Sequence, residues 1–334
     1  MYYLILLISL FLIINFYFKI ADYFNIIDKP NDRSSHSEVT IRGGGLIFTI
    51  GAIGYFISSG FQFYYFILGL LLISMVSFID DIKPTSRSIR IVVHFTAVLL
   101  LFYQLNLLSF SWWIWLIALI ITIGIINAYN FMDGINGITG GYSLAVLCGL
   151  WLANNYNYPF VDNKFIFSLA IALMIFNLYN FRSKARCFGG DVGSVSIAFI
   201  LIFLLGKLIL GSGNIIYLFF LTLYGVDTVL TIIHRIYLKE NIFEPHRKHV
   251  FQILANEAGI SHQKISIAYS VIQTLINVMI VALIDKLSML YLMMLISLLL
   301  FALTVVYIVV KRKYYSLYQG KSPAGNKNHQ LIKK

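Results

Sequence analysis

Residues 111–141 read SWWIWLIALIITIGII followed by NAYNFMDGINGITGG. The first sixteen of these residues carry no charge, which is typical of a segment that lies in a membrane. The chain then places Asn127, Asn130, Asp133 and Asn136 at intervals of three. Side chains three positions apart are neighbours on a helix, so an apolar helix here ends in a row of amide and carboxylate groups. Glycines beside the last two members favour an end of the helix within the row.

The composition of the chain indicates a membrane protein. Its 334 residues are 59% hydrophobic and only 12% charged. A soluble domain carries about a quarter of charged residues. The two cysteines, Cys148 and Cys187, give no disulfide framework, and no Cys/His cluster has the spacing of a zinc site.

Eleven apolar stretches approach the roughly 17–25 residues that a transmembrane helix needs. We therefore expect an all-α, polytopic integral membrane helix bundle of about eleven transmembrane helices. It would form one domain over residues 1–310, followed by a basic cytoplasmic tail over residues 311–334. The first stretch has no basic n-region and no cleavage site, so we expect it to be retained as a helix. The predicted spans are residues 1–19, 43–60, 62–79, 91–108, 111–127, 138–153, 164–180, 193–210, 213–233, 265–284 and 287–310.

Lys and Arg residues concentrate on one side of the predicted bundle. If the N-terminus lies outside, the inner loops and the tail carry 22 of the 25. The positive-inside rule then predicts an outer N-terminus and a cytoplasmic C-terminus. The net charge of +11 is mostly a cytoplasmic face, which suits anionic lipids and anionic substrates. The charge gives no reason to expect a nucleic acid partner.

The unusual polar clusters lie at span ends on this inner side. A channel or transporter would more naturally carry polar residues within its spans. The arrangement favours an enzyme that works at the inner membrane surface. The clusters are SFIDDIKPTSRSIR (77–90), NAYNFMDGINGITGG (127–141), RSKARCFGGDVGS (182–194) and FEPHRKHVFQ (243–252).

Each cluster allows a functional and a structural interpretation. Asp80 and Asp81 are adjacent carboxylates, which are costly unless a cation or basic group neutralises them. They indicate a phosphate and metal site, or a solvated loop start with local ion pairs. The row of amides binds a cation, a phosphate or a nucleotide, or it caps a helix. Asp191 between glycines can face a closely approaching ligand, whereas the basic run from His246 to His249 attracts polyanions or forms a solvated loop.

Two further features stay open at this stage. The loop that carries Arg33, Ser34, Ser35, His36 and Arg42 either lines an anionic site or connects two helices. Asp227 lies inside a predicted span and therefore needs a partner. For Asp227 we favour a structural ion pair over catalysis.

Taken together, the motifs resemble those of the polyprenyl-phosphate N-acetylhexosamine-1-phosphate transferases of glycosyltransferase family 4. The resemblance spans nearly the whole chain and rests on DD, N-x-x-N-x-x-D-G-x-[DN]-G, G-D-V-G-S and H-R-x-H in this order. It implies transfer of an N-acetylhexosamine-1-phosphate from a UDP-sugar to undecaprenyl phosphate, with release of UMP. The product would initiate a cell-surface polysaccharide such as O-antigen or a cell-wall polymer.

The resemblance also implies roles for individual residues. The implied catalytic residues are Asp80, Asp81, Asp133 and His246; the substrate-binding residues are Arg90, Asn127, Asn130, Arg247 and His249; the metal ligand is Asp191. The implied metal is Mg²⁺, with Mn²⁺ as the alternative. The implied location is a bacterial inner (plasma) membrane with the active site on the cytoplasmic side, in contact with membrane lipids. A homodimer is an open alternative to a monomer.

The sequence departs from the family pattern in two places. Asn136 stands where many members carry a second aspartate. The loop PHRKHVFQ resembles that of the O-antigen-initiating enzymes more than the three-histidine run of the peptidoglycan enzyme, which favours UDP-GlcNAc or a related, deoxygenated N-acetylhexosamine. Two rival functions are a carrier or flippase of a polyanionic lipid and a lipid-pyrophosphate phosphatase.

Overall fold

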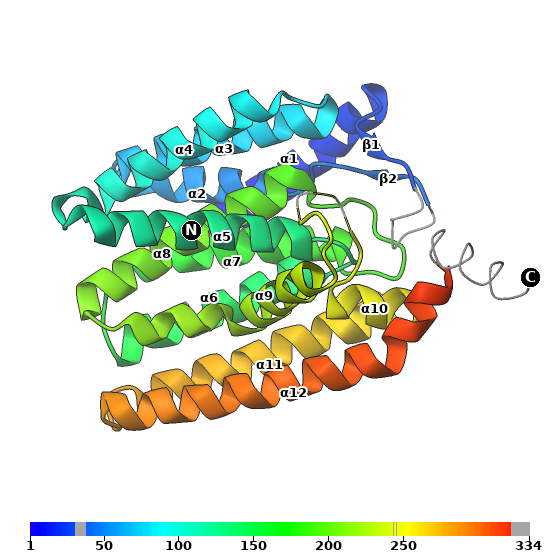
Figure 1. Ribbon diagram of the computed structural model, residues 1–334. Helices are drawn as coiled ribbons and strands as arrows, with labels where there is room; N and C mark the ends of the chain where they lie inside the picture. Colours follow the sequence, from blue (N-terminus) through cyan, green and yellow to red (C-terminus); the bar gives the residue numbers. More distant parts are fainter. Residues whose placement is uncertain (31–37, 243, 245, 322–334) are drawn as a thin grey trace, which may run out of the picture.

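The computed structural model describes residues 1–30, 38–242, 244 and 246–321. This part of the chain folds as a bundle of helices with one small antiparallel ribbon (Figure 1). The helices are α1 (Tyr2–Tyr23), α2 (Leu46–Ser58), α3 (Tyr64–Ile82), α4 (Arg87–Gln104), α5 (Trp112–Met132), α6 (Ile138–Tyr156), α7 (Asn163–Asn180), α8 (Gly190–Ser212), α9 (Thr222–Tyr237), α10 (Val250–Asn256), α11 (His262–Leu283) and α12 (Met289–Lys321). The ribbon pairs β1 (Ile27–Asp28) with β2 (Thr40–Ile41), and the 3₁₀ helices are η1 (Leu107–Ser109) and η2 (Ile215–Leu221).

Within the described residues, nine helical stretches are long and apolar enough to cross a membrane. Each of the eleven predicted spans falls on a helix. The two beyond the nine are α2, a shorter apolar helix of 13 residues, and α6. The expected all-α, multi-pass architecture is therefore confirmed, whereas the number of eleven spans and the orientation stay predictions.

Helix α8 forms the centre of the bundle. A helix that is apolar on every side is expected in the interior. In α8, 83% of the 18 most hydrophobic consecutive residues are buried, against 11% in α12. Helices α2, α3 and α5 pack against α8. The apolar surface of α12, which includes the exposed side chains of Leu298 and Phe301, is suited to contact with lipid.

The polar segments gather at one end of the bundle. The ribbon and α10 lie at this end, together with the connections that follow α3, α5, α7 and α9 (Figure 1). The helices run alternately up and down, so motifs separated by 50 or more residues in the sequence reach the same end. This topology places the DD, amide-row, glycine–aspartate and histidine motifs together.

The start of α2 lies directly against the start of α8. Backbone N–H groups of Gly44 and Gly45 donate to the carbonyls of Phe188 and Gly189 at 2.9 and 3.1 Å. A Cβ atom at position 45 would lie 2.1 Å from the Cα atom of Gly193, closer than any side chain allows. Gly45 is thus required by the close packing of the two helix starts, and Gly44 by the close approach of the segment just before α8, where its Cβ would lie 2.6 Å from Cys187 Sγ.

Two expectations concern the ends of the described regions. The predicted basic tail begins at residue 311, but α12 continues to Lys321, so the first part of that tail is helical. The rest of the tail lies outside the described residues. Arg33, Ser34, Ser35 and His36, which we considered as lining an anionic site, also lie outside them.

Candidate active site

Asp81 joins the end of α3 to the start of α8. Its side chain is completely buried, with 0% exposed. The carboxylate accepts the backbone N–H groups of Asp191 and Val192 at 2.9 and 3.0 Å. These are among the N–H groups that a helix start leaves unpaired, so Asp81 caps α8 from another helix. Sequence analysis predicted a catalytic role for Asp81, and the structure gives its oxygens structural partners.

Arg42 lies between two carboxylates. Its Nε atom is 2.7 Å from Asp81 Oδ1, and its Nη2 atom is 3.3 Å from Asp191 Oδ1. Burial lowers the pKa of the Arg42 guanidinium, but Asp81 and Asp191 outweigh this and raise it. The Asp191 side chain keeps 25% of its surface exposed, unlike that of Asp81. Asp191 is therefore the carboxylate of this pair that can still reach a ligand.

Asp80 faces a different helix from its neighbour. Its Oδ2 atom is 2.8 Å from Arg90 Nη1 on α4, and its Oδ1 atom accepts the Thr85 backbone N–H at 2.6 Å. These contacts fix the turn between α3 and α4. Arg90, which was expected to bind substrate, is thus paired with a carboxylate.

The amide row divides where α5 ends. Asn127 is exposed on α5, and the Asn130 side chain accepts a hydrogen bond from Ser194 of α8 at 3.1 Å. Asp133, immediately after α5, accepts from the Thr139 hydroxyl at 2.7 Å. A Cβ atom at Gly189 would lie 2.9 Å from Asp133 Oδ2. The end of α5 and the glycine–aspartate motif therefore meet, as the sequence motifs led us to expect.

Asn136 is held by the fold. Its side chain is buried, and its Nδ2 atom donates to the carbonyls of Arg182 and Ser183 at 2.8 and 3.1 Å. A carboxylate cannot donate a hydrogen bond to either carbonyl. This explains in physical terms why an amide, and not a second aspartate, stands at position 136.

The basic run lies against the end of α5. The Phe131 ring centre is 6.1 Å from that of His246 and 6.3 Å from that of His249. Arg247 lies 3.8 Å from Glu257, and Lys248 pairs with Glu240. Burial, together with neighbouring positive groups, lowers the pKa of His246 to about 3. His246 is therefore neutral near pH 7 and adds no charge to the site before a substrate arrives.

Asp227 finds its partner in this basic run. The expected buried pair exists, and its other member is His249, whose Nδ1 atom lies 3.3 Å from Asp227 Oδ1. Arg235, which follows two turns later on α9, instead pairs with Glu240 and donates to backbone carbonyls of the segment before α10. The sequence named Arg42 only within a loop that either lines an anionic site or connects two helices, and it did not single out Thr139, Ser194 or Tyr269 as site residues. Only Arg42 had a local signal, since it directly precedes three glycines.

The carboxylates of the site have oxygen atoms of the kind that bind a hard cation, but they do not form a complete set of metal ligands. Among the described residues, no group of three or more His, Cys, Asp or Glu side chains has a geometry that could hold a metal ion. Mg²⁺ commonly takes one or two protein carboxylates and keeps several waters. A partly exposed Asp191 fits that donor set, whereas the fully engaged Asp81 does not.

Comparison with known proteins gives a consistent set of relatives. Residues 63–209 match a family model described as glycosyl transferase family 4. The chain is 25% identical over 272 residues to the probable undecaprenyl-phosphate N-acetylglucosaminyl 1-phosphate transferase of Bacillus subtilis (strain 168), which covers 73% of this chain and 74% of the relative. It is 25% identical over 287 residues to the undecaprenyl-phosphate alpha-N-acetylglucosaminyl 1-phosphate transferase of Escherichia coli (strain K12), covering 77% of each. The Salmonella typhimurium enzyme of the same name is 26% identical over the same coverage.

The geometry at Asp133 predicts a pH-dependent cost to stability. Burial raises the pKa of its carboxyl to about 6, although the hydrogen bond from Thr139 opposes the rise. The contribution of Asp133 to the free energy of unfolding is therefore fully present below the unfolded-state pKa of about 4. It is lost as the pH rises through the folded-state pKa of about 6. Asp133→Asn should raise the free energy of unfolding at pH 7.5 by about 1–3 kcal/mol but leave it nearly unchanged at about pH 3.5. Thermal unfolding in detergent across this range measures the difference.

The exposed Asn127 on α5, the helix that directly precedes Asp133, supplies the control. Asn127→Ala should show the same difference from wild type at every pH. A pH-independent effect of Asp133→Asn would contradict the assignment of a raised pKa to Asp133.

Proposed function

We propose that the chain transfers an N-acetylhexosamine-1-phosphate, GlcNAc-1-phosphate in the first instance, from a UDP-sugar to undecaprenyl phosphate. The match of residues 63–209 to the model of glycosyl transferase family 4 supports the resemblance of the motifs to this family. The observation that carries the proposal is the meeting of three motifs. Asp81 of α3 caps the start of α8, and Asp133 after α5 contacts the same start. The names of the relatives describe the same class of transfer.

The proposed reaction joins two anions. An oxygen of the lipid phosphate attacks the β-phosphorus of the UDP-sugar, a new P–O bond forms, and the bond to the bridging oxygen breaks to release UMP. Positive side chains must offset the repulsion between reactants, because phosphoryl transfer depends on positioning and charge stabilisation. Arg42, Arg90 and Arg247 supply such charges at one end of the bundle. We propose that substrates exchange partners with the carboxylates that hold these arginines.

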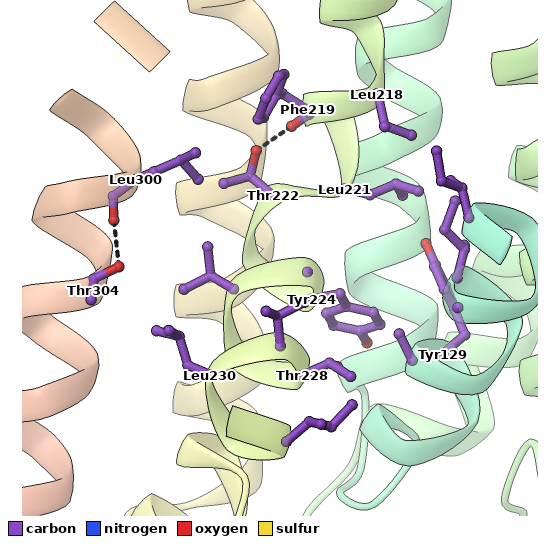
Figure 2. A pocket seen from close by; sticks show the side chains of 18 residues that line it. Tyr129, Leu218, Phe219, Leu221, Thr222, Tyr224, Thr228, Leu230, Leu300 and Thr304 are labelled. Atoms are coloured by element: carbon purple, nitrogen blue, oxygen red, sulfur yellow. Dashed lines mark hydrogen bonds between the residues drawn. The ribbon is translucent and has the colours of Figure 1, made fainter. Parts of the chain in front are cut away.

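An apolar cavity offers a place for the prenyl chain. It has a volume of about 520 Å³ and lies between α5, η2, α9 and α12 (Figure 2). Its lining is almost entirely apolar, and Tyr129 of α5 contributes to it one residue before Asn130 of the amide row. We propose that the lipid tail lies in this cavity, so that its phosphate reaches Asn130 and Asp133. A carrier or flippase is less favoured, since the buried Asp227 is engaged with His249.

We propose Mg²⁺ as the cofactor and Asp191 as its principal protein ligand. When bound, the ion would neutralise charge on the pyrophosphate and stabilise the departing UMP. In this chain, Arg42 holds the Asp191 side chain, and Asp81 holds the backbone beneath it. The proposed catalytic role of Asp80 requires release from Arg90 or Thr85, because both of its oxygens are engaged. His246 would act as a neutral hydrogen-bonding group.

The proposed activity can be measured directly. Purified protein, UDP-GlcNAc labelled in the sugar, undecaprenyl phosphate and Mg²⁺ should yield lipid-linked sugar and UMP in equal amounts. A phosphatase would release inorganic phosphate, and a carrier would yield neither product. A panel of UDP-N-acetylhexosamines in the same assay identifies the preferred sugar. Absence of lipid-linked sugar with every donor would contradict the proposal.

The charge asymmetry predicts that this end of the bundle is cytoplasmic, in a bacterial plasma membrane. Exposed positions allow a test by cysteine labelling in intact cells, after both native cysteines are replaced by alanine. Ser86→Cys should escape an impermeant thiol reagent, whereas Tyr156→Cys, 71% exposed at the opposite end of α6 from the site, should react. The reverse pattern would overturn the orientation.

A magnesium titration distinguishes the proposed metal ligand, Asp191, from Asp81, which caps α8. Asp191→Asn should lower transfer at least about 100-fold while the protein keeps its thermal stability, because an amide oxygen is a weaker ligand for a hard cation. Added Mg²⁺ should recover only part of the loss. Asp81→Asn is the matched comparison and should lower thermal stability, since the N–H groups of Asp191 and Val192 lose a charged acceptor. If Asp191→Asn keeps the wild-type rate and Mg²⁺ dependence, the metal assignment is wrong.

A further inference from the structure

Asp227 is a buried carboxylate outside the cluster of proposed catalytic residues. It lies on α9 with 4% of its surface exposed, within a stretch apolar enough to cross a membrane. A carboxylate in such a place is costly unless its oxygens are satisfied. Oδ1 accepts the Val250 backbone N–H at 3.0 Å and faces His249 Nδ1 at 3.3 Å, and Oδ2 accepts the Tyr269 hydroxyl at 2.8 Å. The carboxylate therefore holds the first turn of α10 and the ring of His249.

The contact with Asp227 determines which nitrogen of His249 is free for other use. An ionised carboxylate only accepts hydrogen bonds, so Nδ1 carries the proton that lies between the two groups. The other nitrogen, Nε2, is buried and has no hydrogen-bond partner among the described residues. Buried polar atoms are nearly always paired, and leaving one unpaired is costly. A histidine retained for packing alone has no reason to present such an atom, so the free nitrogen points to a ligand.

The ring of His249 also lies beside the end of α5, where a Cβ atom at Gly134 would lie 3.0 Å from the ring of Phe251. Its neighbours are the rings of Phe131 on α5, His246 on its own loop and Phe251 on α10, with centres 6.3, 5.0 and 5.8 Å away. Phe131 precedes Asp133 by two residues. The titratable groups beside the ring are thus Asp227 and His246. His249 is placed where a polyanion held at the end of α5 could meet its free nitrogen.

A second residue of α9 fixes the other end of the same segment. Arg235 is 3% exposed, and its guanidinium donates to the carbonyls of Ile242 and Glu244, each at 3.1 Å. Asp227 binds the end of the segment at His249 and Val250, two helical turns away along α9. Helix α9 thus binds both ends of the segment between α9 and α10. The position of His249 follows from α9 and not from the loop's own sequence.

We propose that Asp227 is a positioning residue for His249 in UDP-sugar binding. Its carboxylate accepts from Nδ1–H and orients the ring, and in the complex with the UDP-sugar an N–H at Nε2 donates to a pyrophosphate oxygen. Asp227 itself touches no substrate. This inference rests on the proposed transferase function and assigns the buried aspartate a part in donor binding, beyond the structural ion pair that the sequence led us to expect.

A double-mutant cycle with steady-state kinetics tests the inference. Asp227→Asn and His249→Gln should each lower kcat/KM for UDP-GlcNAc at least about tenfold, with KM for undecaprenyl phosphate changed less than about threefold. Because Asp227 acts through His249, the double variant should be no more than about threefold worse than the poorer single variant. A purely structural loss would lower the amount of active enzyme and leave both KM values unchanged.

Thr231→Val is the matched control. It removes another hydrogen bond to Asp227 Oδ1, of 3.2 Å, but leaves the charge and His249 in place. It should retain kcat/KM for UDP-GlcNAc within about threefold of wild type. If Asp227→Asn does not fold, Asp227→Glu takes its place in the cycle, since it keeps the charge but displaces it by one methylene.

The outcomes separate the inference from the function on which it rests. Three outcomes would each overturn the positioning role. In the first, the losses of kcat/KM from the two single variants multiply in the double variant. In the second, Thr231→Val loses as much kcat/KM as Asp227→Asn, and in the third only the KM for the lipid rises. A wild-type protein that forms no lipid-linked sugar would overturn the proposed function, and the positioning role with it.

Discussion

The carboxylate of Asp81 is the contact on which the polar end of the bundle depends. It takes two N–H groups from the first turn of α8 and a guanidinium N–H from Arg42, with none of its surface exposed. Helix α8 is the most buried helix among the spans, so fixing its start fixes the position of Asp191. The positive end of the helix dipole and the arginine together compensate the buried charge. Removing either the arginine or the helix start would leave this buried charge only partly compensated.

Helical geometry explains why two adjacent aspartates do different work. Neighbouring residues on a helix point about 100° apart, because one turn takes about 3.6 residues. Asp81 therefore faces α8, whereas Asp80 faces Arg90 at the start of α4. The sequence suggests a carboxylate pair that acts on one ion or phosphate. In the structure the two aspartates connect α3 to two different helices. Asp81 pairs with Arg42, and Asp80 pairs with Arg90.

Much of the helical architecture could be predicted from the sequence, since long apolar stretches are a property of local composition. The meeting of the motifs also followed, because alternating helices return every second loop to the same end. The individual contacts did not follow. Asn136 donates to carbonyls more than 45 residues away, and His249 meets Asp227 across a whole loop. Hydrogen-bond partners between distant segments depend on packing angles and on close approaches, such as that of Gly45 to Gly193, which local patterns do not encode.

The site holds charges that the fold alone would not favour. Asp133 is a carboxyl whose pKa burial raises to about 6, and it sits beside a glycine that leaves room for nothing larger. An amide at that position would keep the hydrogen bond from Thr139 without the cost of burying a charge. Asn136, three residues later, is such an amide, and its contacts are satisfied by the fold. The amide of Asn136 therefore serves the stability of the fold. The charge of Asp133 costs stability, which is consistent with a role in binding a ligand.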